Sequence, residues 1–349
     1  MKISTPGRIC LFGEHQDYLG LPVISMAISL RVNIEGDKRD DNNIIIHKRD
    51  LNETEKFSLD NLEYSHSRDY FKSGIKVCQD AGLTFSKGFE CDIVSEIPIQ
   101  AGVSSSSAIV VSWVHFLSKI ADNSLEWDTK RIGELAYQSE VIEFNEPGGI
   151  MDQYTTALGQ LIYLESKPSI FINNLNIKLG TFVLGDSGEK KDTINILKKA
   201  HNSRLFLFQK LKLKNPNNTI YDFDINTDIS DLNDEEIELF NATIINRDLL
   251  NRAMTELNKQ NLNRNLIGKL LYQHHQVLDE LLKVSTPKIN TMLDAAMSAG
   301  ALGGKINGSG GGGCMFAYAP ENPKKIVKAI ESTGGKAYII RMDKGTIVE

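Results

Sequence analysis

The sequence predicts a protein of mixed strands and helices arranged in two lobes. At 349 residues the chain is longer than one typical domain and long enough to bury a large core. Apolar and polar residues alternate with a strand-like period over 21–48, whereas helix-like spacing dominates 236–298. Both patterns in one chain indicate a mixture of strands and helices, without fixing how they are arranged.

The individual elements follow from local patterns and from the residues that stop them. Pro98 ends one strand, Asp122 and Asn123 end a helix, and Pro147 ends another. The predicted strands cover 1–12, 21–48, 89–98, 159–166, 181–188, 314–320 and 336–342, and the predicted helices cover 108–121, 129–144, 236–298 and 324–334.

The segment 214–235 does not fit either pattern. It is rich in Asn and Asp and has little periodicity, so it can bury little apolar surface. We expect a surface excursion there.

The overall charge and composition exclude several classes of function. The net charge is −6 and no block of Lys or Arg is present, so neither nucleic acid nor an anionic membrane is expected as a partner. No apolar segment is long enough for a signal peptide or a membrane span, which predicts a cytoplasmic protein. The four cysteines lie in apolar runs without metal-like spacing, and we expect buried thiols.

The run PGRICLFGEHQDYLG at 6–20 is the most informative segment. A short apolar strand is followed within five positions by Glu14, His15, Asp17 and Tyr18. Two carboxylates, an imidazole and a phenol can exchange many hydrogen bonds with hydroxyl groups. Such a density of polar groups after a buried strand predicts a site for a small polyhydroxylated molecule.

The run PIQAGVSSSSA at 98–108 has the properties of an anion site. Gly102 permits a sharp turn, and the serines that follow it open a predicted helix. Unpaired backbone N–H groups and the helix dipole then attract a phosphate. On this segment alone, a plain helix N-cap made of small residues explains the pattern equally well.

The glycine-rich run GGKINGSGGGGC at 303–314 invites a wrong conclusion. Gly308, Gly310 and Gly313 satisfy G-x-G-x-x-G, but an apolar strand-like run follows in place of a helix. The dinucleotide-binding context is therefore absent, and no G-x-x-x-x-G-K-[ST] motif exists either. We interpret the run as a flexible turn whose backbone can approach another segment closely.

These three segments, in this order, resemble the three motifs of the GHMP small-molecule kinases, and the first resembles the galactokinase branch most. The resemblance implies two α+β lobes with ATP and the acceptor between them. The N-terminal lobe, 1–175, would have the ribosomal protein S5 domain 2-like arrangement, and 176–349 would form the C-terminal GHMP kinase lobe.

The resemblance also assigns roles to residues. The stretch NEPGGIMDQ at 145–153 places Asp152 at the position of the acidic residue near the acceptor, with Arg8 as its partner. A magnesium-binding glutamate would be Glu140, seven residues before Pro147, and Glu143 is the competing candidate on the same helix. Ser106 would be a second magnesium ligand. The nucleotide would contact the following residues: Gly102, Ser104, Ser105, Ser106, Ser107, Gly308, Gly310 and Gly311.

The implied activity is transfer of the γ-phosphate of ATP, with Mg²⁺, to the anomeric hydroxyl of a neutral hexose. Galactose is the first candidate, because the matching residues at 14–18 contact the sugar in galactokinases. Two features depart from that branch: Cys10 replaces an asparagine, and DSGEKKDT at 186–193 looks more like mevalonate-type members. Three alternatives stay open: an N-acetylhexosamine or other sugar, mevalonate, and a non-catalytic sensor that binds sugar and ATP.

Overall fold

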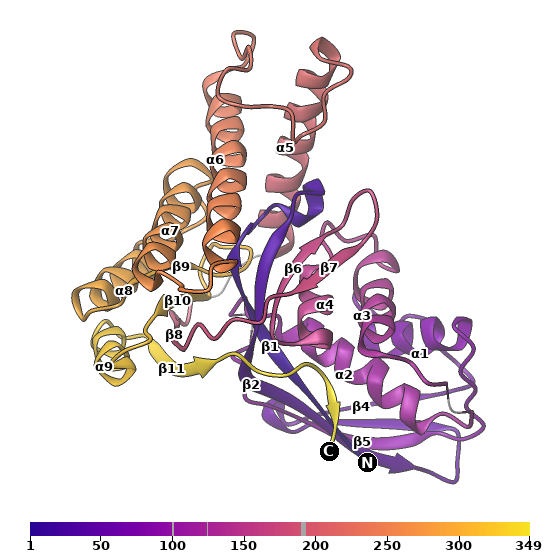
Figure 1. The fold of residues 1–349 in the computed structure, drawn as a ribbon. Coiled ribbons are helices and arrows are strands. Elements are labelled where there is room, and N and C mark those ends of the chain that lie inside the picture. Colours follow the sequence, from indigo (N-terminus) through magenta and orange to yellow (C-terminus); the bar gives the residue numbers. More distant parts are fainter. Residues whose placement is uncertain (100, 124, 190–192) are drawn as a thin grey trace.

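The computed structural model describes residues 1–99, 101–123, 125–189 and 193–349, with only the backbone described at 193–195 and 197–199. A large sheet holds most of the N-terminal half (Figure 1). Its strand order is β12-β1-β2-β5-β3-β4, and β6 and β7 extend from β2. The strands are β1 (Lys2–Phe12), β2 (Val23–Lys38), β3 (Asn43–Lys48), β4 (Glu53–Ser58), β5 (Phe89–Ser95), β6 (Leu161–Glu165), β7 (Phe171–Asn174) and β12 (Ile347–Val348).

A second sheet of four strands, in the order β11-β8-β10-β9, lies in the C-terminal half. All its neighbouring strands run antiparallel. Its strands are β8 (Thr181–Asp186), β9 (Gly303–Ile306), β10 (Cys314–Tyr318) and β11 (Lys336–Arg341).

Four helices cover one face of the large sheet (Figure 1). The central one, α2, packs on β1 and β2 and also contacts the other three helices. Its side chains are almost all buried, as its apolar composition predicts. The helices are α1 (Tyr70–Asp80), α2 (Ser105–Ile120), α3 (Thr129–Tyr137) and α4 (Met151–Leu158).

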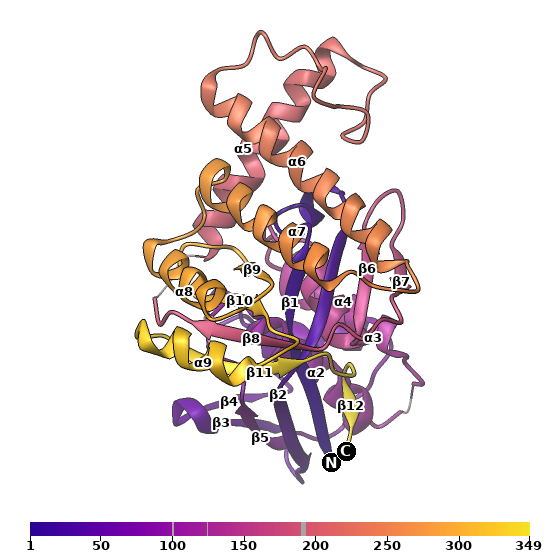
Figure 2. The same ribbon diagram turned by 60° about the vertical axis from the view of Figure 1, so that its left-hand side comes forward.

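The remaining helices belong to the C-terminal half. Figure 2 shows α7, α8 and α9 against the second sheet, while α5 and α6 project beyond both sheets. A capping box between Asn233 and Glu236 fixes the start of α6, and Pro287 occupies the first turn of α8. The helices are α5 (Thr193–Lys214), α6 (Asp234–Leu257), α7 (Arg264–Gln276), α8 (Pro287–Ser298) and α9 (Pro323–Ser332).

The two sheets share one hydrophobic core. A single buried cluster contains Phe12 from β1, Phe182 from β8 and Leu250 from α6. The chain also returns to its beginning, because β12 pairs with β1 at Ile3 and Ser4. The predicted boundary between residues 175 and 176 falls between β7 and β8. However, β12, at the end of the chain, belongs to the N-terminal sheet. The division into two lobes at that boundary therefore stays a prediction.

Most of the expected elements are present, and the differences concern continuity. The expected helix over 129–144 is α3 followed by a π-helical turn at Gln138–Ile142. The region 236–298 contains three helices separated by turns, and 215–233 consists of turns, as its composition predicts. Among the helices, sequence patterns missed α1, α4 and α5 altogether. The stretch 186–193 lies partly outside the described residues.

Two further expectations concern the chain as a whole. All four cysteines, Cys10, Cys78, Cys91 and Cys314, are buried free thiols. In the part of the chain that the structure describes, no helix combines the length and apolar character that crossing a membrane requires.

Backbone contacts place the glycine-rich run beside the serine loop. The amide of Cys314 donates to the carbonyl of Ala101 at 2.7 Å, and the Asn307 side chain donates to the carbonyl of Gly102 at 2.7 Å. A Cβ on Gly308 would lie 2.7 Å from the same Gly102 oxygen. Since real side chains avoid such distances, glycine is required for this approach. The expected close approach of the run to another segment is therefore confirmed.

A substitution at Gly268 tests how α7 holds β9, the strand that leads into the glycine-rich turn. A Cβ there would lie 2.2 Å from the Leu302 carbonyl oxygen, where α7 meets β9. We expect Gly268→Ala to lower the free energy of unfolding by about 1–3 kcal/mol, although alanine favours helix. Lys269→Ala, on the exposed side of the same helix, should change it by no more than about 0.5 kcal/mol. Urea unfolding of both variants measures this, and equal stabilities would contradict the packing account.

Candidate active site

A pocket of about 490 Å³ gathers residues from all three sequence motifs. Most of the residues predicted from the sequence line it: Arg8, Glu14, His15, Asp17, Tyr18, Gly102, Ser104, Ser105, Ser106, Ser107, Glu140, Asp152 and Gly308. The glycines Gly310 and Gly311 do not line it; they pack against Val284 and Ile196. Their positive φ angles of 81° and 73° serve the turn that brings Gly308 to the loop.

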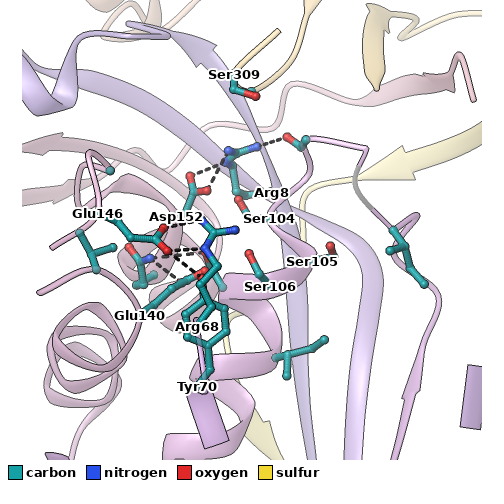
Figure 3. Close-up of a pocket in the computed structure, with 18 of the residues that line it drawn as sticks. Arg8, Arg68, Tyr70, Ser104, Ser105, Ser106, Glu140, Glu146, Asp152 and Ser309 are labelled. Atoms are coloured by element: carbon teal, nitrogen blue, oxygen red, sulfur yellow. Dashed lines mark hydrogen bonds and ion pairs between the residues drawn. The ribbon is translucent and has the colours of Figure 1, made fainter. Parts of the chain in front are cut away.

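The Arg8–Asp152 pair lies at the middle of this site (Figure 3). Arg8 donates to both carboxylate oxygens of Asp152, at 2.8 and 3.0 Å, and to the carbonyl of Gly102 at 2.5 Å. The pairing of β1 with β2 is irregular between Pro6 and Arg8, as at a β-bulge, which redirects the arginine. Burial opposes the charge of Arg8, but Asp152 and Glu14 outweigh it and raise the guanidinium pKa.

The serine loop ends at the N-terminus of α2. Ser104 is the cap residue and has a left-handed φ of 59°; its hydroxyl makes no side-chain cap. That hydroxyl is buried and has no hydrogen-bond partner in the described structure. The backbone N–H groups of the first turn are therefore not covered by a capping side chain, which leaves them for an anion. The plain N-cap interpretation of these serines does not hold.

Glu140 and Glu143 separate clearly in the structure. The π-helical turn adds one residue, so that the Glu143 amide donates to the Gln138 carbonyl at 3.0 Å. Glu140 is buried in the pocket and accepts from Gln153 Nε2 at 2.6 Å. Glu143 is exposed and accepts from the Tyr64 hydroxyl instead. Burial raises the pKa of Glu140, and hydrogen bonds from Gln153 and the side chains of Ser107 and Ser106 offset part of that rise.

The two carboxylates of the first motif, Glu14 and Asp17, have different hydrogen-bond partners. Glu14 forms a buried ion pair with Lys305 at 2.8 Å, and Lys305 also donates to the Cys10 carbonyl. Asp17 accepts a 3.4 Å bond from the amide of Met151, the first residue of α4. Burial, with the nearby charge of Asp152, raises the pKa of Asp17 to about 6. Glu14 and Asp152 are each paired with a cation, whereas Asp17 makes no ion pair in the described structure.

His15 and Tyr18 form the wall of the same end. The Nδ1 atom of His15 lies 3.2 Å from the Tyr18 hydroxyl, and its Nε2 atom lies 3.1 Å from the Ser309 carbonyl. The fully buried Arg204 donates to the Tyr18 hydroxyl at 2.5 Å and to the His15 carbonyl. Burial raises the pKa of Tyr18 to about 12, so it stays a neutral phenol.

Several pocket residues have no sequence signal. Arg68, immediately before α1, donates to both carboxylate oxygens of Glu146, and Tyr70 donates to Glu146 at 3.3 Å. Arg68 and Tyr70 come from a segment without a motif, and Glu146 lies in the 145–153 stretch but had no role assigned there. Lys305, in the glycine-rich run, and Arg204 were missed because only folding brings them to residues far away in the chain.

The comparison with known families agrees with this geometry. The description "GHMP kinases N terminal domain" matches residues 69–160, "GHMP kinases C terminal" matches 249–336, and "Galactokinase galactose-binding signature" matches 2–38. The chain belongs to the GHMP kinase family. GHMP kinases are phosphotransferases that act on hydroxyl groups, so this chain is a phosphotransferase, and its α+β fold is the family's.

Both mevalonate kinases and galactokinases are among the relatives of this GHMP kinase. The mevalonate kinase of Thermococcus gammatolerans is 27% identical over 98% of this chain and 96% of its own length. The galactokinase of Mannheimia succiniciproducens is 26% identical over 98% and 91%. Among solved structures, Lactococcus lactis galactokinase complexed with galactose has a TM-score of 0.84 at 24% identity, covering 99% of this chain and 94% of that one. Methanococcus jannaschii mevalonate kinase has a TM-score of 0.75 at 22% identity, covering 99% and 98%.

Two neighbouring glycines of this kinase allow a local test of the Asp17 position. A Cβ on Gly149 would lie 1.8 Å from Asp17 Oδ2, whereas a Cβ on Gly148 would meet nothing closer than 3.6 Å. We expect Gly149→Ala to displace Asp17 and to raise the KM for the hydroxyl acceptor by about tenfold or more. Gly148→Ala should raise it by much less. Steady-state kinetics at saturating ATP measures both, and equal effects would show that the contact is unimportant.

Proposed function

We propose that this protein is an ATP- and Mg²⁺-dependent sugar kinase that phosphorylates the anomeric hydroxyl of a neutral hexose, with galactose as the first candidate. The observation that carries the proposal is the position of the Arg8–Asp152 pair. It lies between the serine loop on one side and the polar residues of the first motif on the other. A phosphate donor and a polyhydroxylated acceptor would meet there.

The nucleotide would occupy the serine-loop side of the pocket. Backbone N–H groups at the start of α2 and the orphaned Ser104 hydroxyl offer donors to phosphate oxygens. Apolar side chains of Phe71, Ile99 and Ile109 line the same pocket and provide a surface for a purine ring.

The residues present fit a magnesium ion. Glu140 is a buried carboxylate, and its hydrogen-bond partners in the described structure are amide and hydroxyl groups rather than a lysine or arginine. Such a buried carboxylate beside Ser106 is a suitable pair of oxygen ligands. When bound, Mg²⁺ would neutralise charge on the phosphates of the nucleotide.

Asp152 would orient the acceptor hydroxyl. Its two oxygens are held by Arg8, so the position of the carboxylate is fixed. The hydroxyl donates its hydrogen bond to Asp152 and passes its proton to that carboxylate as its oxygen attacks the γ-phosphorus. The bond from that phosphorus to the bridging oxygen then breaks and ADP leaves. Alignment and electrostatic stabilisation supply most of the catalysis in such transfers.

The charge at the acceptor end favours a neutral sugar. Asp17 lines this end without an ion pair in the described structure, and its pKa is raised by burial and by the nearby charge of Asp152; Asp152 and Glu14 are paired with Arg8 and Lys305. A carboxylate on the acceptor would add a further negative charge and would be repelled. The match of residues 2–38 to the galactose-binding signature supports the same choice.

A hydroxy acid such as mevalonate is the second candidate. Relatives named mevalonate kinase match the chain over nearly its full length. In addition, the partners of the buried Arg204 in the described structure are Tyr18, His15 and Thr243, and none of them is a carboxylate. A carboxylate on the acceptor could pair with this guanidinium if Tyr18 moved.

An acceptor panel tests the proposal. ADP release would be measured with Mg²⁺-ATP and galactose, glucose, N-acetylgalactosamine, galacturonate, arabinose or mevalonate, and phosphorus NMR would identify the product. We expect turnover of a neutral hexose and an anomeric phosphate. Preference for mevalonate would refute the sugar assignment and leave the kinase, whereas binding of sugar and ATP without turnover would favour the sensor.

The role of Asp152 gives a separate prediction. Asp152→Asn keeps the size of the side chain but removes the charge that orients the hydroxyl. We expect turnover to fall roughly 10²- to 10⁴-fold, with ATP affinity nearly unchanged. Steady-state kinetics and calorimetry measure the two quantities. Equal losses in both would mean that Asp152 only maintains the structure.

The metal assignment is tested by a matched pair on the same turn. We expect Glu140→Gln to raise the Mg²⁺ concentration needed for half-maximal activity by at least about tenfold. Glu143→Gln, which alters only an exposed carboxylate bonded to Tyr64, should leave it unchanged. A magnesium titration at fixed ATP distinguishes them, and the reverse ranking would transfer the role to Glu143.

A further inference from the structure

A paired arginine crosses the nucleotide side of the pocket. Arg68 donates through Nε and Nη2 to the two oxygens of Glu146, and its guanidinium carbon lies 5.9 Å from the centre of the Tyr70 ring. In Figure 3 its side chain extends between Glu146 on one side and the serines of the loop on the other. None of the three sequence motifs contains either partner.

The backbone of Arg68 is held in an uncommon conformation. Its φ angle is 64°, in the left-handed region that non-glycine residues seldom adopt. The carbonyl of Arg68 accepts from the Tyr70 amide at 2.7 Å, which fixes this turn immediately before α1. Conformations of this kind cluster at ligand sites, where the surrounding structure maintains them. Here the result is an arginine directed into the pocket.

The charges around the pocket leave a role for this arginine. A nucleotide triphosphate brings several negative charges, and the chain has no phosphate-loop lysine of the G-x-x-x-x-G-K-[ST] type. Arg8 is engaged by Asp152 and Gly102, and Lys48 pairs with Glu55 at 2.9 Å. Arg68 is 35% exposed, and its Nη1 donors make no hydrogen bond in the described structure.

We propose that Arg68 binds the β- and γ-phosphates of the nucleotide and that Glu146 is its partner only while the phosphates are absent. This proposal rests on the proposed use of ATP. A guanidinium binds carboxylate and phosphate with the same two-pronged geometry, so phosphate oxygens can replace the Glu146 oxygens without moving the backbone. Arg68 is partly exposed, and Glu146 would keep its hydrogen bond from the Tyr70 hydroxyl after the exchange.

The test compares nucleotides that differ only in phosphate number. Calorimetry on the full chain would measure the affinities of Mg²⁺-ATP, Mg²⁺-ADP, AMP and adenosine for the wild type and for Arg68→Met. We expect Arg68→Met to weaken ATP and ADP roughly 10- to 100-fold and to change AMP and adenosine less than about threefold. Arg68→Lys should recover part of the loss, since a single ammonium group cannot form both bonds.

Two matched variants separate phosphate binding from a structural role. Glu146→Gln removes the competing charge and should leave ATP affinity equal or up to about tenfold higher. Arg131→Met removes an arginine from a comparable exposed pair with Glu134, away from the pocket, and should change no affinity.

The outcomes divide clearly. The inference is overturned if Arg68→Met weakens adenosine as much as ATP, if it weakens neither, or if Glu146→Gln weakens ATP as much as Arg68→Met does. Those results would leave ATP binding by the wild type, and hence the proposed function, intact. A wild-type chain that binds no nucleotide would overturn both.

Discussion

The ion pair between Arg8 and Asp152 is the interaction on which the site depends. It joins β1 to the start of α4, and through the Gly102 carbonyl it also fixes the serine loop. Arg8 is almost fully buried, so removing its partner would leave an uncompensated charge and cost several kilocalories per mole. The same pair orients the acceptor in the proposed reaction. Both the stability of the fold and the proposed reaction therefore require Arg8 and Asp152 to stay paired.

The remaining parts of the site are arranged around that pair by close backbone contacts. The glycine-rich run meets the serine loop through hydrogen bonds to Ala101 and Gly102, so it cannot move independently of the loop. On the other side, the start of α4 contacts Asp17 through Gly149 and Met151. The serine loop and the start of α4 are thus each held by close backbone contacts. Such contacts would keep the phosphate donor and the acceptor aligned in the proposed reaction.

Sequence reasoning found residues marked by a local pattern or by the family resemblance and missed pairs that form only on folding. Asp17 stands in a dense polar run after a strand, and Asp152 was assigned by the resemblance of 145–153 to the family motif. Arg68 and Glu146 are 78 positions apart, and Lys305 and Glu14 are 291 apart. Such pairs are created by tertiary packing and leave no local periodicity.

Local structure also determines which of two neighbouring glutamates faces the pocket. Glu140 and Glu143 lie on one helical segment, and an ideal helix would place them within one turn on nearly the same face. The π-helical turn changes that register, directing Glu140 into the pocket and Glu143 toward Tyr64 at the surface. A single inserted residue in the hydrogen-bond ladder is not visible in an amphipathic pattern, so this distinction needed coordinates.

The most direct test of the central claim is a crystal structure of the protein with Mg²⁺, a non-hydrolysable ATP analogue and galactose. The account predicts that the anomeric oxygen lies within hydrogen-bonding distance of Asp152, with Arg8 still paired to that carboxylate and the γ-phosphate over the start of α2. An acceptor hydroxyl directed away from Asp152, or phosphates bound away from the serine loop, would contradict it.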